Sequence, residues 1–367
     1  MCSSDLPEFG RPGLEYFAGS HLNPNVTWWN QAGPFLTYLG RCQHMLRQGR
    51  FVADVCCYTG DKPYQHWGRG EKWSTEATLE LPKGYTYDLV NDEVLLERMR
   101  VEKNFLVLPD GMRYRLLVVD LDDETADPAV LGKVAELADA GATVVLGRRR
   151  PERTPGLKDF PVCDETLRQA AERLWGAPDG AAGVRRAGKG RIAAGVELAR
   201  LLESLKALPD FEGPWAYTHR RAGAADIYFV AGQGDAECTF RVRGKEPELW
   251  DATTGRLRDA ACYRAAPDGR TIVPLSLPEG GSTFVVFRRP AADPHLVSVA
   301  APAEALELAG RSPTGVRVRL WQPAACTAET SDHKQLKLEP VALPAPIGLA
   351  GPWEVRFGPG IDRKSVV

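Results

Sequence analysis

Between residues 51 and 205 the chain alternates short apolar runs with helical patterns, and this alternation constrains the fold more than any other feature. The apolar runs suit buried strands and stand at 51–61, 114–119, 141–147 and 191–195. Helical spacing occurs between and after them, at 94–99, 128–140, 163–176 and 196–205. Strands that alternate with helices predict a parallel sheet with helices on both faces. We therefore expect a flavodoxin-like α/β domain over 51–208.

Three residues mark where helices of this domain are expected to begin or end. Pro128 suits the first turn of one helix, and Gly141 is the natural stop after it. Asp164 is a plausible amino-terminal cap for the following helix.

After Pro209 the pattern changes to short alternating strands joined by Gly, Asp and Pro turns. These strands are expected at 217–232, 237–244, 247–259, 271–278 and 281–289. Such a series is typical of an antiparallel β-sandwich, which we place over 209–290. Residues 291–345 are rich in Ala and Pro, and 349–357 begin another strand. We therefore expect a linker and the start of a further sugar-binding-like β-sandwich within 291–367.

The first part of the chain predicts one βα unit. Residues 13–30 are expected to form a short strand followed by a polar, aromatic loop. Residues 31–48 have the apolar spacing of an amphipathic helix, and Gly49 stands at the usual stop position.

The loop of this unit holds the densest group of candidate binding residues, which are His21, Asn23, Asn25, Trp28 and Trp29. Aromatic faces stack on the C–H surfaces of sugars, while amide and imidazole groups bind hydroxyls, so this group suits carbohydrate. The alternative is structural: the two Trp side chains anchor a core, and Asn23-Pro24 is a turn.

Catalytic carboxylates are not apparent near this loop. Glycoside hydrolysis usually needs two carboxylates, one of them acting as an acid. Before Gly49 the chain has only Asp5, Glu8 and Glu15, and none lies at a position that favours catalysis. We assign no catalytic residue.

Composition argues against several classes of partner. The chain has 367 residues and a formal net charge of -2, which gives no reason to expect nucleic acid as a partner. No stretch approaches the roughly 20 apolar residues of a membrane span. The dinucleotide motif G-x-G-x-x-G does not follow the apolar run at 51–61, and the P-loop motif is absent throughout. The six His residues show no metal-ligand spacing.

The eight Cys residues form no C-x-x-C pair, and most lie in apolar runs. This favours small buried hydrophobes over a zinc site or disulfides, so the cysteines leave the cellular compartment open. Cys57 also permits an amidotransferase-like nucleophile, although its place inside a predicted strand argues against that role. The triplet His219-Arg220-Arg221 suits carboxylate binding, an exposed strand end or an ion pair between domains.

An ordered set of motifs covering most of residues 13–290 resembles the family 106 α-L-rhamnosidases. The set begins with Gly19-Ser20-His21, Thr27-Trp28-Trp29, Arg41-Cys42-Gln43, Leu46 to Gly49 and Ala53-Asp54-Val55. It continues through 84–99, 108–119, 140–147, 219–232, 240–255 and 281–290.

The resemblance implies a (β/α)8 catalytic barrel followed by accessory α/β and β-sandwich domains. It implies hydrolysis of terminal α-L-rhamnosyl residues with inversion, by two glutamates and with a calcium ion in the full-length parent. Residues 1–50 would then be the end of the barrel, with His21, Asn23 and Asn25 on its substrate side and Trp28 at the edge of that side. Both chain ends suggest truncation, so we expect the glutamates and the calcium ion outside this chain.

Two questions stay open at the level of sequence. The segment Asn23-Pro24-Asn25 departs from the family's pattern, which leaves a different glycoside or a uronide as substrate. A carbohydrate-binding or scaffolding protein without catalysis is the alternative function. Because a solitary βα unit lacks its barrel, we expect residues 13–48 to pack loosely or to expose apolar surface.

Overall fold

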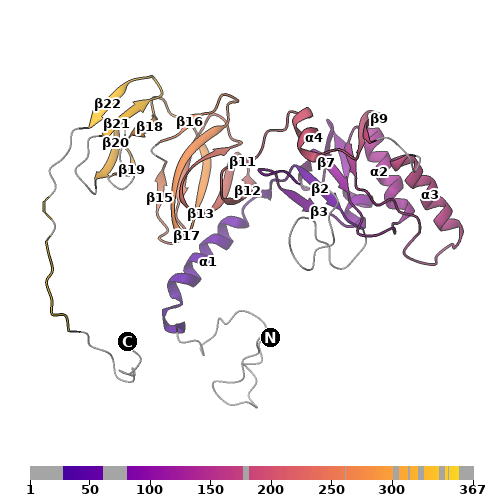
Figure 1. Ribbon diagram of the computed structural model, residues 1–367, viewed down its shortest axis with the longest axis horizontal. Coiled ribbons are helices and arrows are strands. Elements are labelled where there is room, and N and C mark those ends of the chain that lie inside the picture. The colour runs from indigo at the N-terminus through magenta and orange to yellow at the C-terminus, as the bar shows by residue number, and fades with distance from the viewer. Residues whose placement is uncertain are drawn as a thin grey trace, which may run out of the picture.

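The computed structural model describes residues 28–60, 81–176, 182–260, 262–300, 306–312, 315–320, 326–338, 344–345 and 347–354. Three regions lie side by side along the longest axis of the molecule (Figure 1): a parallel sheet with helices, a larger antiparallel sheet, and a group of short carboxyl-terminal strands. None of the helices in the described ranges is long and apolar enough to cross a membrane.

The first region is built on a six-stranded sheet with the order β3-β2-β7-β8-β10-β9. Its strands are β2 (Val55–Tyr58), β3 (Tyr87–Leu89), β7 (Leu116–Val119), β8 (Thr143–Leu146), β9 (Gly183–Ala187) and β10 (Gly190–Ala194). All neighbours are parallel except β9, which runs antiparallel to β10 at the edge. The chain moves from β2 outward to β3 and then back across β2 to β7, so the order reverses at β2.

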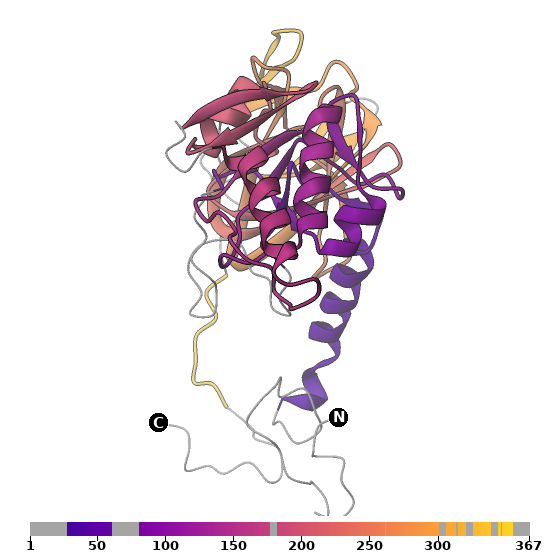
Figure 2. The ribbon, with the colours of Figure 1, turned by 90° about the vertical axis from the view of Figure 1, so that its right-hand side faces the viewer.

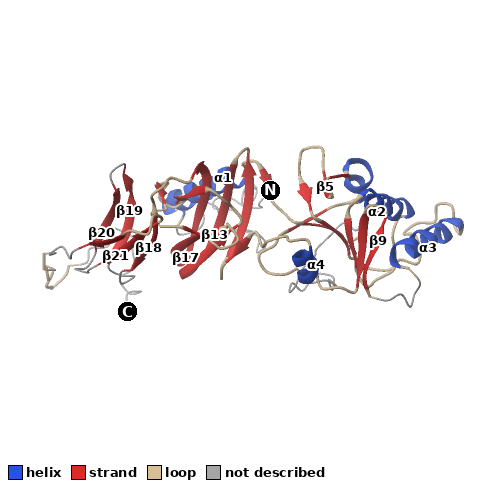
Figure 3. Ribbon diagram, turned by 90° about the horizontal axis from the view of Figure 1, so that it is seen from above, coloured by secondary structure: helices blue, strands red, loops and turns tan. Residues whose placement is uncertain are grey.

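Helices cover both faces of this sheet, as the alternating pattern predicts (Figure 3). The helices are α2 (Pro128–Ala140), α3 (Val162–Trp175) and α4 (Leu198–Ser204), with a π-helical turn at Val94–Arg98. Buried residues of α2 and α3 pack with Leu117 and Val119, whereas those of α4 pack with Leu116 and Val118. Alternate residues of one strand therefore supply two separate cores. Figure 2 views α2 and α3 from their own side.

The expected ends of α2 are confirmed, but the predicted cap of α3 is wrong. α2 begins at Pro128, and Gly141 follows its end with a φ of 128°. α3 begins at Val162, which places Asp164 inside the first turn. The Asp164 carboxylate instead accepts hydrogen bonds from the backbone N–H and the hydroxyl of Thr154, both at 2.8 Å. These bonds lower the pKa of Asp164.

Two predicted strands are each divided between sheets. The run 51–61 becomes β1 (Arg50–Phe51), which pairs with the antiparallel sheet, and β2 of the parallel sheet. The break contains Asp54, a buried charge that must reach cationic partners. The run 114–119 likewise divides between β6 (Arg113–Tyr114) and β7. β6 belongs to a small antiparallel sheet with β4 (Arg100–Glu102) and β5 (Phe105–Val107).

The second region is one eight-stranded antiparallel sheet with the main order β1-β12-β13-β17-β14-β15. Its further strands are β11 (Phe211–Glu212), β12 (Ala216–Ala222), β13 (Ala225–Phe240), β14 (Lys245–Trp250), β15 (Leu257–Asp259), β16 (Arg264–Ala265) and β17 (Thr271–Pro290). The four short strands predicted at 217–244 and 271–289 are thus replaced by β12 and two long strands, β13 and β17.

The long strands fold over a single core. Tyr228 from the first half of β13 and Phe240 from the second half belong to the same buried cluster, as do Val273 and Phe287 from the two halves of β17. The pairing of β13 with β17 shifts register between Gly232 and Gly234. Glycines that look like turn signals therefore allow a bulge and a bend inside continuous strands.

Helix α1 (Gly33–Leu46) packs on the outer face of this sheet, next to β13 and β17 (Figure 1). Buried Cys42 contacts a cluster that includes Ile227 and Phe284. Arg41 donates hydrogen bonds of 2.9 Å to the carbonyls of Ala252 and Thr253. The expectation of loose packing is therefore wrong for the carboxyl-terminal half of α1.

The third region contains a three-stranded sheet and a hairpin. The sheet comprises β18 (Leu296–Ala300), β21 (Cys326–Thr330) and β22 (Gln335–Leu338), and the hairpin comprises β19 (Leu306–Ser312) and β20 (Gly315–Leu320). Of the strand expected at 349–357, residues 349–354 form no strand and the remainder lies outside the described residues.

Candidate functional site

Two of the five predicted carbohydrate-contacting residues lie in the described part of the chain. Trp28 and Trp29 immediately precede α1, whereas His21, Asn23 and Asn25 fall outside the described residues. The side chain of Trp28 is 40% exposed, and Trp29 is half-buried. Trp28 is thus not buried among the described residues, which is expected of a barrel segment without its barrel.

Trp28 forms an apolar surface with the first turn of α1. Its ring lies edge-to-face with that of Phe35, at a centroid distance of 6.3 Å and an interplanar angle of 86°. Phe35 is 46% exposed and its neighbour Leu36 is 42% exposed. We call Trp28, Phe35 and Leu36 the α1 tip; it lies on the part of α1 that extends beyond the antiparallel sheet (Figure 2). The three side chains together give the α1 tip an exposed apolar surface.

A cavity of about 430 Å³ lies between α1 and the antiparallel sheet. Met45, Trp250, Leu257 and Phe284 give it a largely apolar lining. Asp251 also lines it, and its carboxylate accepts hydrogen bonds from the Thr254 hydroxyl (2.6 Å) and from two backbone N–H groups. Although burial opposes the effect, these bonds lower the pKa of Asp251. The carboxylate therefore stays ionised, and its hydrogen bonds to Thr253 and Thr254 stabilise the turn in which Asp251 lies.

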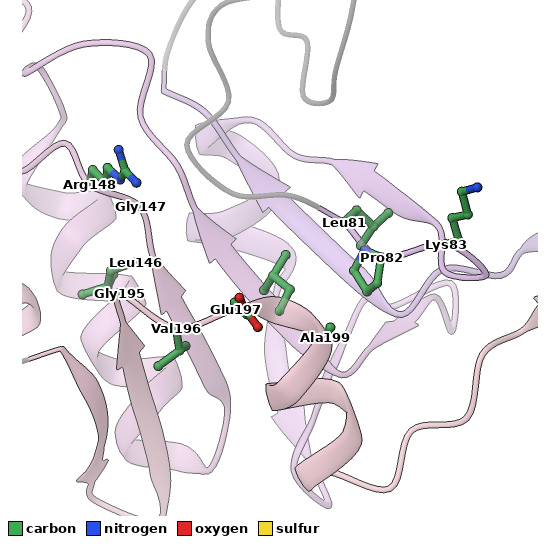
Figure 4. A pocket seen from close by; sticks show the side chains of 11 residues that line it. Leu81, Pro82, Lys83, Leu146, Gly147, Arg148, Gly195, Val196, Glu197 and Ala199 are labelled. Carbon is green, nitrogen blue, oxygen red and sulfur yellow. The ribbon is translucent and has the colours of Figure 1, made fainter.

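A second cavity, of about 510 Å³, lies at the carboxyl ends of β8 and β10 (Figure 4). Open α/β sheets bind ligands at this end of their strands. Arg148 and Lys83 stand on opposite sides of the cavity with Glu197 between them. Glu197 is paired with Arg200 at 3.2 Å. This cavity is lined by charged side chains, but it contains only one carboxylate and no arrangement that indicates catalysis.

Neither cavity brings two carboxylates together, since each is lined by one. Residues 28–50, which contain the α1 tip, include no Asp or Glu. Among the described residues, no three His, Cys, Asp or Glu side chains are grouped as a metal site would require. Neither cavity and no part of the α1 tip therefore holds the pair of carboxylates that glycoside hydrolysis usually needs.

The thiol of Cys57 does not suit a nucleophile. It is fully buried in β2, and burial, reinforced by the charge of Asp120, raises its pKa well above the usual range. The thiol therefore stays protonated and out of reach, which removes the amidotransferase-like alternative.

The most strongly charged buried cluster was not predicted as such. Arg241 donates to both carboxylate oxygens of Asp54 at 2.9 Å and pairs with Asp210 at 3.1 Å. His219 of the basic triplet lies in the same cluster and pairs with Asp210. Of the three roles considered for the triplet His219-Arg220-Arg221, an ion pair agrees with the contacts of His219. Asp54 could have been singled out from the sequence as a buried charge, because it is the one charged residue in the apolar run 51–58.

Comparison with known proteins gives consistent relatives of much greater length. A curated relative from Formosa agariphila, named "Putative beta-glucuronidase", is 30% identical over 292 residues, which are 76% of this chain and 23% of the relative. The solved structure of the rhamnosidase from Novosphingobium sp. PP1Y is 28% identical, with a TM-score of 0.62. That match covers 84% of this chain and 32% of the rhamnosidase.

The chain thus spans less than two thirds of either relative. The model of glycoside hydrolase family 106, described as alpha-L-rhamnosidase, matches residues 2–265. This match covers the parallel-sheet region and most of the antiparallel sheet, and it agrees with the motifs that carry the resemblance. The chain therefore belongs to glycoside hydrolase family 106.

Proposed function

We propose that this chain is a carboxyl-terminal region of an inverting glycoside hydrolase that removes terminal α-L-rhamnosyl residues from polysaccharides. The family match over residues 2–265 carries this proposal. In it, residues 1–50 end the catalytic barrel, 51–208 form a flavodoxin-like domain and 209–290 form a β-sandwich. Residues 291–367 are the linker and the start of a further domain. The strand order of the parallel sheet and the folded antiparallel sheet support these divisions.

The two catalytic glutamates lie outside this chain in the proposal. An inverting enzyme holds its carboxyl groups about 6.5–9.5 Å apart so that a water molecule fits between the base and the sugar. The described residues provide no such pair around the α1 tip or either cavity. The described residues contain no group of three His, Cys, Asp or Glu side chains that could hold a metal ion. In this proposal the calcium ion belongs to the part of the enzyme that lies outside this chain.

The role of this chain is to support the barrel and to contribute to its sugar-binding edge. His21, Asn23, Asn25, Trp28 and Trp29 are the proposed substrate-side residues. The exposure of Trp28 favours this role, because a stacking platform must be open to the ligand. The docking of the carboxyl-terminal half of α1 on the antiparallel sheet supports this role, because it fixes the helix that follows Trp28 and Trp29.

A β-glucuronide is the second candidate substrate. The name of the Formosa relative favours it, and the departure at Asn23-Pro24-Asn25 leaves room for it. A non-catalytic carbohydrate-binding protein is the remaining alternative, favoured by the exposed α1 tip.

Activity assays on this chain and on the longer reading frame that contains it separate these functions. We expect no hydrolysis of an aryl α-L-rhamnoside by the chain alone and clear hydrolysis by the longer protein, because only the latter would hold both glutamates. Turnover by the isolated chain would contradict the assignment of the acid and base elsewhere. Hydrolysis of an aryl β-D-glucuronide in place of the rhamnoside would establish the second candidate.

Replacement of Trp28 by alanine tests the sugar-contacting surface. We expect the Kd for L-rhamnose, measured by titration calorimetry, to rise about tenfold, which is about 1.4 kcal/mol, because the stacking face is lost. Trp353→Ala is the matched control, since Trp353 is 71% exposed but lies near the other end of the chain. Equal affinity of the Trp28 variant and the unsubstituted chain would remove Trp28 from the site.

A further inference from the structure

Both ring nitrogens of His219 face carboxylates. Nδ1 lies 3.0 Å from each oxygen of Asp210, and Nε2 lies 3.2 Å from Oδ1 of Asp226. A neutral imidazole has one N–H, so its other nitrogen would present a lone pair to a carboxylate oxygen. Only the imidazolium donates from both nitrogens. The two contacts together therefore favour a protonated ring.

The surroundings of the ring stabilise its positive charge. The His219 side chain has no exposed surface, and those of Asp210 and Asp226 are 1% and 7% exposed. Tyr228 stacks on the imidazole at a centroid distance of 3.9 Å and an interplanar angle of 12°. A cation held against an aromatic face in a water-poor site gains more than it would at the surface.

Each carboxylate has further cationic or hydroxyl partners from neighbouring elements. Asp226 accepts from Arg221 of β12 at 2.8 Å and from Lys245 of β14 at 2.7 Å. Asp210 accepts from the Tyr228 hydroxyl at 3.0 Å and pairs with Arg241. Burial alone would lower the pKa of His219, but the charge and hydrogen bonds of Asp210, followed by those of Asp226, raise it above its usual value. The pKa values of both carboxyls are lowered.

This cluster lies where the chain crosses between the parallel-sheet region and the antiparallel sheet. The first crossing, 52–54, joins β1 to β2, and the second, 205–210, joins α4 to β11. The backbone N–H of Val52 donates to the carbonyl of His219 at 3.0 Å. Arg241 binds Asp54 of the first crossing and also the carbonyl of Leu208 (2.8 Å) in the second. His219 is thus joined to both crossings.

We propose that the His219 imidazolium is a pH-sensitive latch that fastens the parallel-sheet region to the antiparallel sheet and opens when the ring loses its proton. Loss of the proton removes the positive charge between Asp210 and Asp226 and leaves one of these buried carboxylates facing a lone pair, which weakens the attachment of the segment around Asp210. The sign follows from the raised pKa: the stabilisation is complete below the unfolded-state value of about 6.5 and is lost as pH rises through the higher folded-state value. The latch therefore opens at alkaline pH.

Nuclear magnetic resonance of the histidine-¹⁵N-labelled chain tests the protonation state directly. We expect one histidine to keep the two similar ring-nitrogen shifts of an imidazolium at pH 8. His219→Gln should remove that signal. His295→Gln is the control: His295 also stacks on a tyrosine, at 4.0 Å, but uses only Nδ1 in its hydrogen bonds. Neutral ring shifts for every histidine at pH 8 would overturn the proposal.

Trypsin tests the opening, because the second crossing contains the exposed Lys206. The rate of cleavage after Lys206 is measured relative to that after Lys334, which is 74% exposed and lies in the third region. We expect this ratio to rise at least tenfold between pH 7 and pH 10 in the unsubstituted and His295→Gln chains. In His219→Gln it should be high throughout. A constant ratio in the unsubstituted chain would overturn the proposal even if the His219 variant failed to fold.

Discussion

Replacing Phe240 by alanine is expected to lower the free energy of unfolding by about 3–5 kcal/mol, the range for large aromatic side chains deleted from a core. Phe240 is fully buried in the second half of β13. Its ring lies 5.3 Å from that of Phe211, 4.9 Å from that of Tyr228 and 5.5 Å from that of Phe287. Because Tyr228 comes from the first half of the same strand, the substitution opens a cavity between the two layers of the folded sheet.

Chemical denaturation followed by tryptophan fluorescence measures this loss. Phe35→Ala is the matched control, since Phe35 is 46% exposed at the α1 tip and its removal should change stability by no more than about 0.5 kcal/mol. Equal losses for the two variants would mean that β13 does not fold over a shared core.

The parallel-sheet region was predictable because its signals are local. All residues of β7 and β8 are buried and all but Thr143 are apolar, and α2 begins at Pro128 and ends before Gly141. An apolar run flanked by turn residues suits only a strand that is buried on both faces. Four of the six strands, β2, β7, β8 and β10, therefore lie within a few residues of their predicted places, whereas β3 and β9 were not predicted. The sequence also contains nothing that sets the order of the strands in the sheet.

The antiparallel sheet was harder to predict because a glycine can stand either in a turn between two strands or at a bend within one strand. Gly232 ends one predicted strand and Gly281 begins another, yet they stand opposite each other in the continuous β13–β17 pair. A Cβ atom on Gly232 would lie 2.3 Å from the Trp215 ring, so this glycine allows close packing and not a chain reversal. The same composition fits several short strands or two long bent ones, and only long-range pairing decides between them.

The candidate site was predictable in part. The position of Trp28 before a helix followed from local spacing, and its exposure agrees with a binding role. The charged cluster of Asp54, Asp210, His219 and Arg241 could not be predicted, because its members are up to 187 positions apart in the chain. Charges of this kind become partners only when both chain crossings are brought to one place.

Replacing Arg241 by methionine is the second large effect that we expect, a loss of about 3–5 kcal/mol in the free energy of unfolding. Methionine keeps much of the volume but removes the cation between two carboxylates that are nearly without exposed surface. Arg115 still pairs with Asp54 at 3.0 Å, and His219 still pairs with Asp210, so the loss should fall toward the lower end of that range.

The control for this variant is Arg264→Met. Arg264 also binds a carboxylate through two nitrogens, that of Glu237, but the two side chains are 37% and 59% exposed. An exposed ion pair contributes about 0–1 kcal/mol because water and salt screen it. Denaturation midpoints of both variants, measured at low and at high salt, separate the cases: only the Arg264 effect should shrink with salt. The Arg241 variant could instead lose no more stability than the Arg264 variant. In that case backbone hydrogen bonds and packing would hold the two crossings, and the buried charges would contribute little to the free energy of unfolding.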